Sequence, residues 1–337
     1  MRHPNRKPQY LKNPRKRVSA LETDLLADSS QRYSSIAPRL ANGESRQAFK
    51  IIDKLAKTSM PQGKLMAADM AIEVATKTPG SAEQKQELLG KARNIWQTIC
   101  SNELSLNTIS YFGARARIGL SILPAISSIA IDRTLPDIQK TNAMYHNLIL
   151  TANDVVKLSI DGHKRGDTRT SKYAAGLAGE LAVNLLLLRF DINELGGEGE
   201  VALPSFFSED AFGLNKRTNH GNSAWDISVF TDCSDDNISL LHAIQVKHSI
   251  HRSQSVASIQ EKYDSSIACV VVNSDLALKP EEHVGTKSAM RSIIGCTLSE
   301  LNDNMANSRV TSLLDARTEL LLDTLDARSL NPPAIHY

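Results

Sequence analysis

Residues 223–248, SAWDISVFTDCSDDNISLLHAIQVKH, carry the pattern from which the fold can be predicted. Apolar and polar residues alternate over 224–230 and again over 240–247, which predicts two β-strands, each with one buried face. The residues between them, 231–239, are rich in Asp, Ser and Asn, which favour turns. The two strands are therefore expected to form a hairpin.

Three polar residues of these strands are expected on the same side of the hairpin. Asp226 alternates with apolar neighbours in the first strand, where Asp is uncommon. Gln245 and Lys247 are two residues apart in the second strand and therefore share a face. A pairing of Phe230 with Leu241 would place Asp226 opposite Gln245. A carboxylate, an amide oxygen and an ammonium group would then converge on one face of the sheet.

A fourth polar residue, Glu180, interrupts a helix predicted over 172–190. The run 174–188 is apolar on nearly every side, so this helix should be buried, and an ionised carboxylate there is costly unless it meets a cation or hydrogen-bond donors. Glu180 is expected to reach the sheet face that carries Asp226. Hard oxygen donors of this kind suit Mg²⁺ or Mn²⁺, which retain water and pair with phosphate oxygens.

The rest of the chain divides into regions of different periodicity. Before residue 160, apolar residues at three- and four-residue spacing predict consecutive helices, either a bundle or hairpins similar to tetratricopeptide repeats. Further strands are predicted on either side of the hairpin. The second domain is expected to contain further strands at 201–207 and 267–272 and a helix at 253–263. The expected divisions of the chain are a basic flexible arm (1–29), a helical domain (30–160), a linker (161–171), this second domain (172–290) and a C-terminal helical segment (298–330).

The order of these elements resembles the PD-(D/E)XK nuclease superfamily, in particular the Q-x-K variant found in Mrr-like restriction endonucleases. Glu180 lies in the leading helix, Asp226 in the second strand and the segment 245–247, Gln-Val-Lys, in the third. The resemblance covers roughly residues 172–272, about a third of the chain. It implies an α+β protein in which an all-helical N-terminal domain precedes a restriction-endonuclease-like α/β core with a mixed central sheet and a C-terminal helix.

The resemblance also implies an activity, a cofactor and a role for each residue of the motif. The protein would be a Mg²⁺- or Mn²⁺-dependent endonuclease that hydrolyses phosphodiester bonds in DNA. Asp226, the Gln245 side chain and the Val246 carbonyl would bind the metal, with Glu180 binding it directly or through water. Lys247 would position or deprotonate the attacking water and stabilise charge in the transition state. Gln245 replaces the commoner acid and removes one negative charge, which should weaken metal affinity.

Basic and polar residues in two places indicate contact with nucleic acid. Residues 1–17 contain seven Lys or Arg and no acid, so the remaining residues carry a net charge of −5 against the chain's total of +2. Such an arm can bind phosphates without sequence preference. Polar residues before Asp226 and after Lys247 can contact phosphates or base edges. These expected contact residues are Lys216, Arg217, His220, His248, Arg252 and Gln254.

Composition narrows the class of protein further. The 337 residues include 39 Lys and Arg, 37 Asp and Glu and 41% hydrophobic residues, which is ordinary globular composition. The longest apolar stretch, 118–131, is shorter than the roughly 20 residues of a membrane-spanning helix, and the first residues do not resemble a secretory signal. A cytoplasmic protein, nucleoid-associated in a bacterium, is therefore expected. Its four Cys form no C-x-x-C pair, which disfavours structural zinc.

Several alternatives remain open at this stage. DNA is the expected partner, with RNA as an alternative, in restriction, defence or repair. Because restriction-type enzymes commonly act as dimers, the segment 298–330 is a candidate homodimer interface. The chain could instead be a catalytically inactive nucleic-acid-binding or scaffold protein whose helical domain binds a protein partner. It could also lack a nuclease core and be an interaction protein built on helical hairpins.

Overall fold

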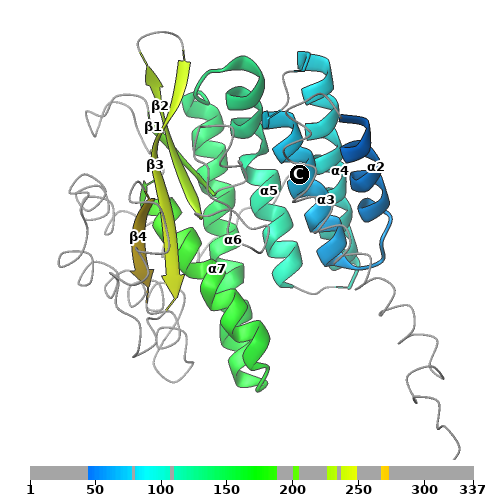
Figure 1. Ribbon diagram of the computed structural model, residues 1–337. Helices are drawn as coiled ribbons and strands as arrows, with labels where there is room; N and C mark the ends of the chain where they lie inside the picture. The colour runs from blue at the N-terminus through cyan, green and yellow to red at the C-terminus, as the bar shows by residue number, and fades with distance from the viewer. Residues whose placement is uncertain are drawn as a thin grey trace, which may run out of the picture.

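The computed structural model describes residues 45–77, 80–106, 110–187, 200–204, 226–233, 237–248 and 267–272. The basic arm (1–29), the helix predicted at 253–263 and the C-terminal helical segment (298–330) lie outside the described residues. Within the described part, a stack of helices lies on one side of a small sheet, as Figure 1 shows.

The helices follow one another closely along the chain. Each packs against the next, and α3 also contacts α5, while α5 contacts α7. Residues of α3, α5 and α7, which are far apart in sequence, are therefore close together in the structure. The helices are α2 (Ser45–Ala56), α3 (Pro61–Lys77), α4 (Ala82–Leu106), α5 (Tyr111–Ser127), α6 (Ile138–Lys164) and α7 (Thr168–Leu187), and α5 continues into a short π-helix over Ser128–Asp132.

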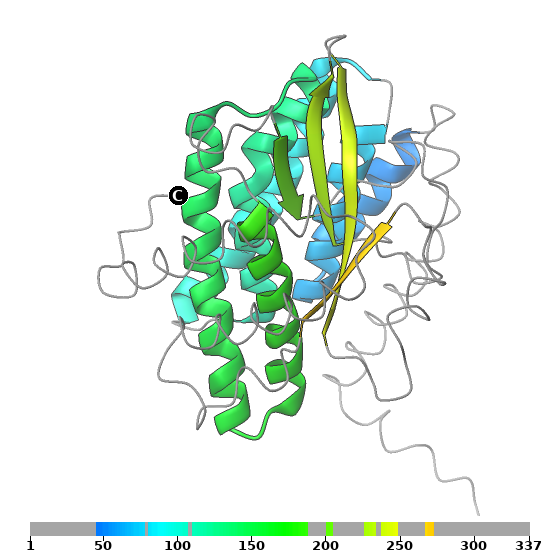
Figure 2. The same ribbon diagram turned by 90° about the vertical axis from the view of Figure 1, so that its left-hand side faces the viewer.

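The sheet contains four described strands in sequence order, and Figure 2 shows it in front of the helices. Neighbouring strands are antiparallel except the last pair, which is parallel, so the sheet is mixed. The last strand has the predicted bounds, and the other three differ from prediction at their ends. The strands are β1 (Glu200–Pro204), β2 (Ile227–Cys233), β3 (Asn237–His248) and β4 (Ile267–Val272).

The hairpin formed by β2 and β3 has the predicted register at one end. Ile227 pairs with Ile244, and because the strands are antiparallel the preceding residue, Asp226, lies beside Gln245. This is the neighbourhood predicted from the alternation of the two strands.

At the other end of the hairpin the register differs from the prediction by one residue. Phe230 pairs with Leu240 and not with Leu241. The cause is an irregularity of the β-bulge type between Val229 and Phe230, which gives β3 one extra residue. The bulge shifts the turn end of the hairpin and leaves the end near Asp226 unchanged.

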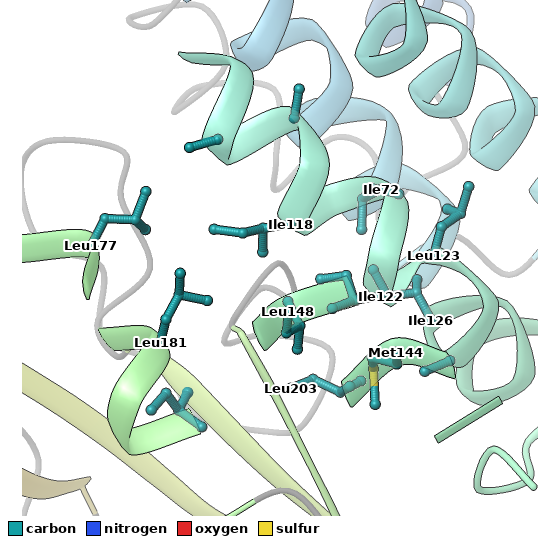
Figure 3. Close-up of a cluster of buried hydrophobic side chains, with 14 of the residues drawn as sticks. Ile72, Ile118, Ile122, Leu123, Ile126, Met144, Leu148, Leu177, Leu181 and Leu203 are labelled. Carbon is teal, nitrogen blue, oxygen red and sulfur yellow. The ribbon is translucent and has the colours of Figure 1, made fainter. Parts of the chain in front are cut away.

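Helices and strands share one hydrophobic core. Side chains from the six helices α2 to α7 and from β1, β2 and β3 meet in it, and α7 packs against the sheet as well as against α6. Figure 3 shows part of this core, with Ile72, Ile118, Ile122, Leu123, Ile126, Met144, Leu148, Leu177, Leu181 and Leu203 labelled. The sheet is therefore attached to the helical stack through α7.

The predicted linker, 161–171, is mostly helical. Helix α6 continues to Lys164 and α7 begins at Thr168, so the break is a short turn in which Gly166 has a positive φ of 70°. Close packing holds the two helices together there, since the Ser159 hydroxyl donates to the Ser171 carbonyl at 2.9 Å. The polar composition that suggested a linker belongs to helix ends and a turn.

The apolar segment Tyr111–Asp132 is long and apolar enough to cross a membrane by length and composition alone. However, 67% of its most apolar window is buried inside the protein. A core helix accounts for this composition, since α5 lies between α4 and α6.

Candidate functional site

Asp226 is held against the backbone of β3 by two hydrogen bonds. Its own N–H donates to the Ile244 carbonyl at 2.8 Å, and its Oδ2 accepts the Val246 N–H at 2.7 Å. A hydrogen bond between an amide and an ionised carboxylate is stronger than one between neutral groups. The Asp226 carboxylate is therefore fixed beside Val246, the middle residue of the Gln-Val-Lys segment.

The Gln-Val-Lys segment lies in a central strand, because β3 pairs with β2 on one side and β4 on the other. Val246 pairs with Val270 and is buried, with 2% exposure, as is Ile244 with 0%. The burial predicted for Ile244 and Val246 is confirmed. The side chains of Gln245 and Lys247 lie outside the described part of the structure.

Glu180 comes from α7 and meets a cation, as its position in an apolar helix predicted. Its Oε2 lies 3.8 Å from Nη1 of Arg115 on α5, and each side chain is 28% exposed. The carboxylate is thus half-buried and not fully enclosed. Because α7 also packs on β1, β2 and β3, this ion pair lies where the helical stack meets the sheet.

Arg115 connects three carboxylates from different elements. It interacts electrostatically with Glu180 on α7, with Asp226 beside β2 and with Asp69 on α3. Burial alone would lower the pKa of Arg115, but these carboxylates, together with Tyr111, raise it above its ordinary value. The guanidinium therefore pairs with Glu180 and also interacts electrostatically with Asp226, the two side chains that the sequence motif predicts as metal ligands.

Asp69 has the most perturbed carboxyl group in this neighbourhood. Burial at its position on α3 raises its pKa to about 6, although Arg115 acts in the opposite direction. A carboxyl group with a raised pKa beside a charged partner is typical of functional sites, although structural ion pairs also produce it. Asp69 therefore belongs to the same electrostatic unit as Arg115.

The start of α5 is fixed one turn before Arg115. Ser110 caps the helix, its Oγ accepting the Gly113 N–H at 3.2 Å. Glu103 on α4 accepts the same N–H at 3.1 Å and also accepts the Ser110 hydroxyl. These contacts satisfy helix-terminal donors and define where Arg115 projects from α5.

An aromatic pair borders the ion pair. The rings of Tyr111 on α5 and Tyr173 on α7 have centroids 5.7 Å apart, and Tyr173 is 53% exposed. Burial raises the pKa of Tyr111. Tyr111 is one turn from Arg115, and Tyr173 is two turns from Glu180, so the two contacts lie along the same seam between α5 and α7.

The residue types at this site are those that a hard divalent cation prefers. Asp226 and Glu180 would supply carboxylate oxygens and Val246 a backbone carbonyl, a set that suits Mg²⁺ with several retained waters. Among the described residues, His, Cys, Asp and Glu side chains form no group of three or more that could hold a metal by themselves. The amide of Gln245 would have to complete the set.

Sequence reasoning singled out Asp226 and Glu180 but not Arg115 and Asp69, which interact electrostatically with each other and, through Arg115, with both predicted residues. Both missed residues are charges within helices that are otherwise largely buried, the same kind of signal that drew attention to Glu180. The side chains predicted to contact nucleic acid lie outside the described residues. They are Lys216, Arg217, His220, His248, Arg252 and Gln254.

Comparison with known proteins adds no relative, because no family model, curated protein or solved structure matches the chain.

Proposed function

We propose that the protein is a Mg²⁺-dependent endonuclease that hydrolyses phosphodiester bonds in DNA. One observation carries this proposal: Asp226 and Glu180, which come from different elements, both interact with the guanidinium of Arg115. Carboxylates from two different elements therefore act on one cationic side chain, which supports a site where both could act on a metal ion. The adjacent strand carries the Gln-Val-Lys segment that the nuclease motif requires.

The proposed roles follow from how each residue is held. Bound Mg²⁺ or Mn²⁺ would polarise the phosphodiester and help to ionise the attacking water. Asp226, fixed by the Val246 amide, would present its carboxylate to the metal together with the Val246 carbonyl, Gln245 and Glu180. Lys247 would orient the water and stabilise negative charge that develops on the phosphate.

Substrate binding would extend beyond the metal ligands. We propose that Lys216, Arg217, His220, His248, Arg252 and Gln254 contact the DNA. The basic residues in 1–17 would add affinity that decreases with salt. A homodimer formed through 298–330 would bring two sites to the two strands.

A cleavage assay tests this function. Labelled double-stranded DNA, single-stranded DNA and RNA are incubated with the full chain in Mg²⁺ or in EDTA. The wild type should cut DNA only with the metal, and Asp226→Asn and Lys247→Ala should each reduce the rate by about a hundredfold or more, as loss of a transition-state contact typically does. Preferential cutting of RNA would change the substrate class.

Matched controls separate the site from general effects of charge. Asp161→Asn and Lys157→Ala change the same residue types at exposed positions of α6 and should leave the cleavage rate unchanged. Cutting that survives both site substitutions would show that the chosen residues are wrong. DNA binding without cutting would favour a non-catalytic nucleic-acid-binding protein, an alternative favoured by Gln245, which lacks the negative charge of the commoner acid.

A further inference from the structure

The charged cluster at the site includes two residues that the nuclease motif does not contain. Arg115 and Asp69 come from α5 and α3, in the helical region that precedes the motif. They reach the site because alternate helices contact each other, α3 with α5 and α5 with α7. The sheet and α7 therefore supply only part of the charge around Glu180 and Asp226.

The negative charges of this cluster outnumber its positive charges. Asp69, Glu180 and Asp226 contribute three negative charges when ionised, Arg115 contributes one positive charge, and Lys247 of the motif would contribute a second. The resulting net charge of −1 would attract a divalent cation. Without Asp69, the two positive charges would cancel the two remaining carboxylates and leave no net charge.

The position of Arg115 is set by contacts on several sides. The capped start of α5 lies one turn before it, Glu180 lies 3.8 Å from its Nη1, and Tyr111 on the same helix packs on Tyr173 of α7. An arginine held in this way can orient a carboxylate, because its guanidinium is a planar fork of donors.

We propose that Arg115 and Asp69 are positioning residues of the metal site. Arg115 orients the Glu180 carboxylate, and Asp69 offsets the charge of Arg115 so that Glu180 and Asp226 can bind a divalent cation. This inference rests on the proposed nuclease function. It assigns to the helical region a direct part in assembling the site, beyond packing or partner binding.

Metal affinity measured without substrate tests the inference. Mn²⁺ binding to the full chain is followed by titration calorimetry or by the electron paramagnetic resonance signal of the free ion. Asp69→Asn should weaken Mn²⁺ binding about tenfold, because the Arg115 guanidinium, no longer offset by the Asp69 carboxylate, then repels the cation. Arg115→Gln should strengthen binding by a similar factor, because it removes that repulsion.

Activity gives a second readout that differs from affinity. Arg115→Gln should lower kcat in saturating Mg²⁺ although it binds metal more tightly, because Glu180 is no longer oriented. Arg115→Lys keeps the charge but not the planar fork, so it should retain wild-type metal affinity and restore part of kcat. General damage to the fold would instead weaken binding in every variant.

A neighbouring ion pair provides the matched control. Arg117 lies two residues further along α5, and its Nη1 pairs with Oδ2 of Asp154 on α6 at 3.0 Å. Arg117→Gln and Asp154→Asn should leave the Mn²⁺ affinity unchanged, even if they lower stability.

The outcomes distinguish this inference from the proposed function. If the wild type binds Mn²⁺, Asp226→Asn abolishes binding and the Asp69 and Arg115 variants match the wild type, the positioning role is wrong and the nuclease proposal stands. If Asp69→Asn and Arg115→Gln shift affinity in the same direction, the charge-balance argument is wrong. If the wild type binds no Mn²⁺ and cuts no substrate, both proposals are wrong.

Discussion

Asp69 is a carboxyl group that the fold makes costly to ionise. Burial on α3 raises its pKa from 3.8 to about 6, so the folded protein retains a proton that the unfolded chain releases between about pH 4 and pH 6. Stability therefore falls as the pH rises through this window, and at neutral pH the folded state contains a carboxylate that would be better solvated in the unfolded chain. A costly charge beside Arg115 is consistent with a functional role.

Asp69→Asn should stabilise the protein at neutral pH. The amide imitates the protonated acid, so we expect the free energy of unfolding at pH 7.5 to rise by about 1–2 kcal/mol, at roughly 1.4 kcal/mol per pKa unit before allowance for the partial exposure of the side chain. Urea unfolding between pH 3.5 and pH 8 measures the effect. The gain should shrink as the pH falls below 6 and vanish below about 4.

The control for this pH dependence is Asp154→Asn, which alters an ion pair on another face of α5. Asp154→Asn should not show the increase in unfolding free energy above pH 4 that is expected for Asp69→Asn. A loss of stability in Asp69→Asn at neutral pH would show that attraction to Arg115 outweighs burial, which would reverse the direction of the pKa shift. If Asp69→Asn is more stable and also binds metal more weakly, the native Asp69 lowers the stability of the fold and supports metal binding.

At the residue scale, the sequence predicts the part of the site that depends on local pattern. Period-two alternation placed Asp226 beside Gln245, and a charge in an apolar helix marked Glu180 as needing a cation. The identity of that cation could not be predicted, because Arg115 and Asp69 approach through contacts between alternate helices. Such contacts depend on the packing angles of whole helices and leave no short-range signal in the sequence.

The elements themselves depend on close packing at a few small residues. Gly119 in the middle of α5 lies directly against Trp96 of α4, which is fully buried. A β-carbon at Gly119 would overlap the indole ring, so the two helices approach as closely as they do only because no side chain is present there. Gly90, six residues before Trp96 on α4, has open space around its missing β-carbon.

Alanine substitutions at these two glycines should have opposite effects on stability. Gly119→Ala should destabilise the protein by about 1–3 kcal/mol, the usual cost of overpacking a well-packed core. Gly90→Ala should stabilise it by about 0.5–1 kcal/mol, because Ala has the better helix propensity and meets no neighbour. Chemical denaturation followed by far-UV circular dichroism measures both. Equal effects at the two positions would contradict the described contact between α4 and α5.

At the scale of elements, periodicity predicted most of what is described and failed at specific irregularities. The bulge in the hairpin shifts Phe230 by one residue because one extra residue in β3 has no signature in the alternation. The segment 161–171 was predicted as a linker because its residues are polar, yet they form the end of α6, a turn and the start of α7. Polar residues are common both in linkers and at helix ends, so composition alone does not distinguish them.

The whole molecule has one hydrophobic core in its described part, and this core joins regions that the sequence divides into two domains. Leu181 of α7 and Leu203 of β1 lie in the same cluster as Ile118 of α5 and Leu148 of α6, as Figure 3 shows. One face of α7 packs on the sheet and another on α6. Separation of the two regions would therefore expose apolar surface on both sides of the break.

We expect the helical stack and the sheet to unfold in a single transition. In a Trp225→Phe variant, Trp96 is the remaining tryptophan, so the fluorescence of the protein reports on α4. Hydrogen exchange of the Val246 amide, which donates a hydrogen bond to Asp226, reports on the sheet. Both probes should give the same denaturation midpoint, because loss of the shared core removes support from both regions at once. A fragment 161–337, which lacks α5 and most of α6, should not unfold cooperatively. Two separate midpoints, or a fragment with a sharp transition of its own, would show that the regions are independent domains and that the site forms at a loose junction between them.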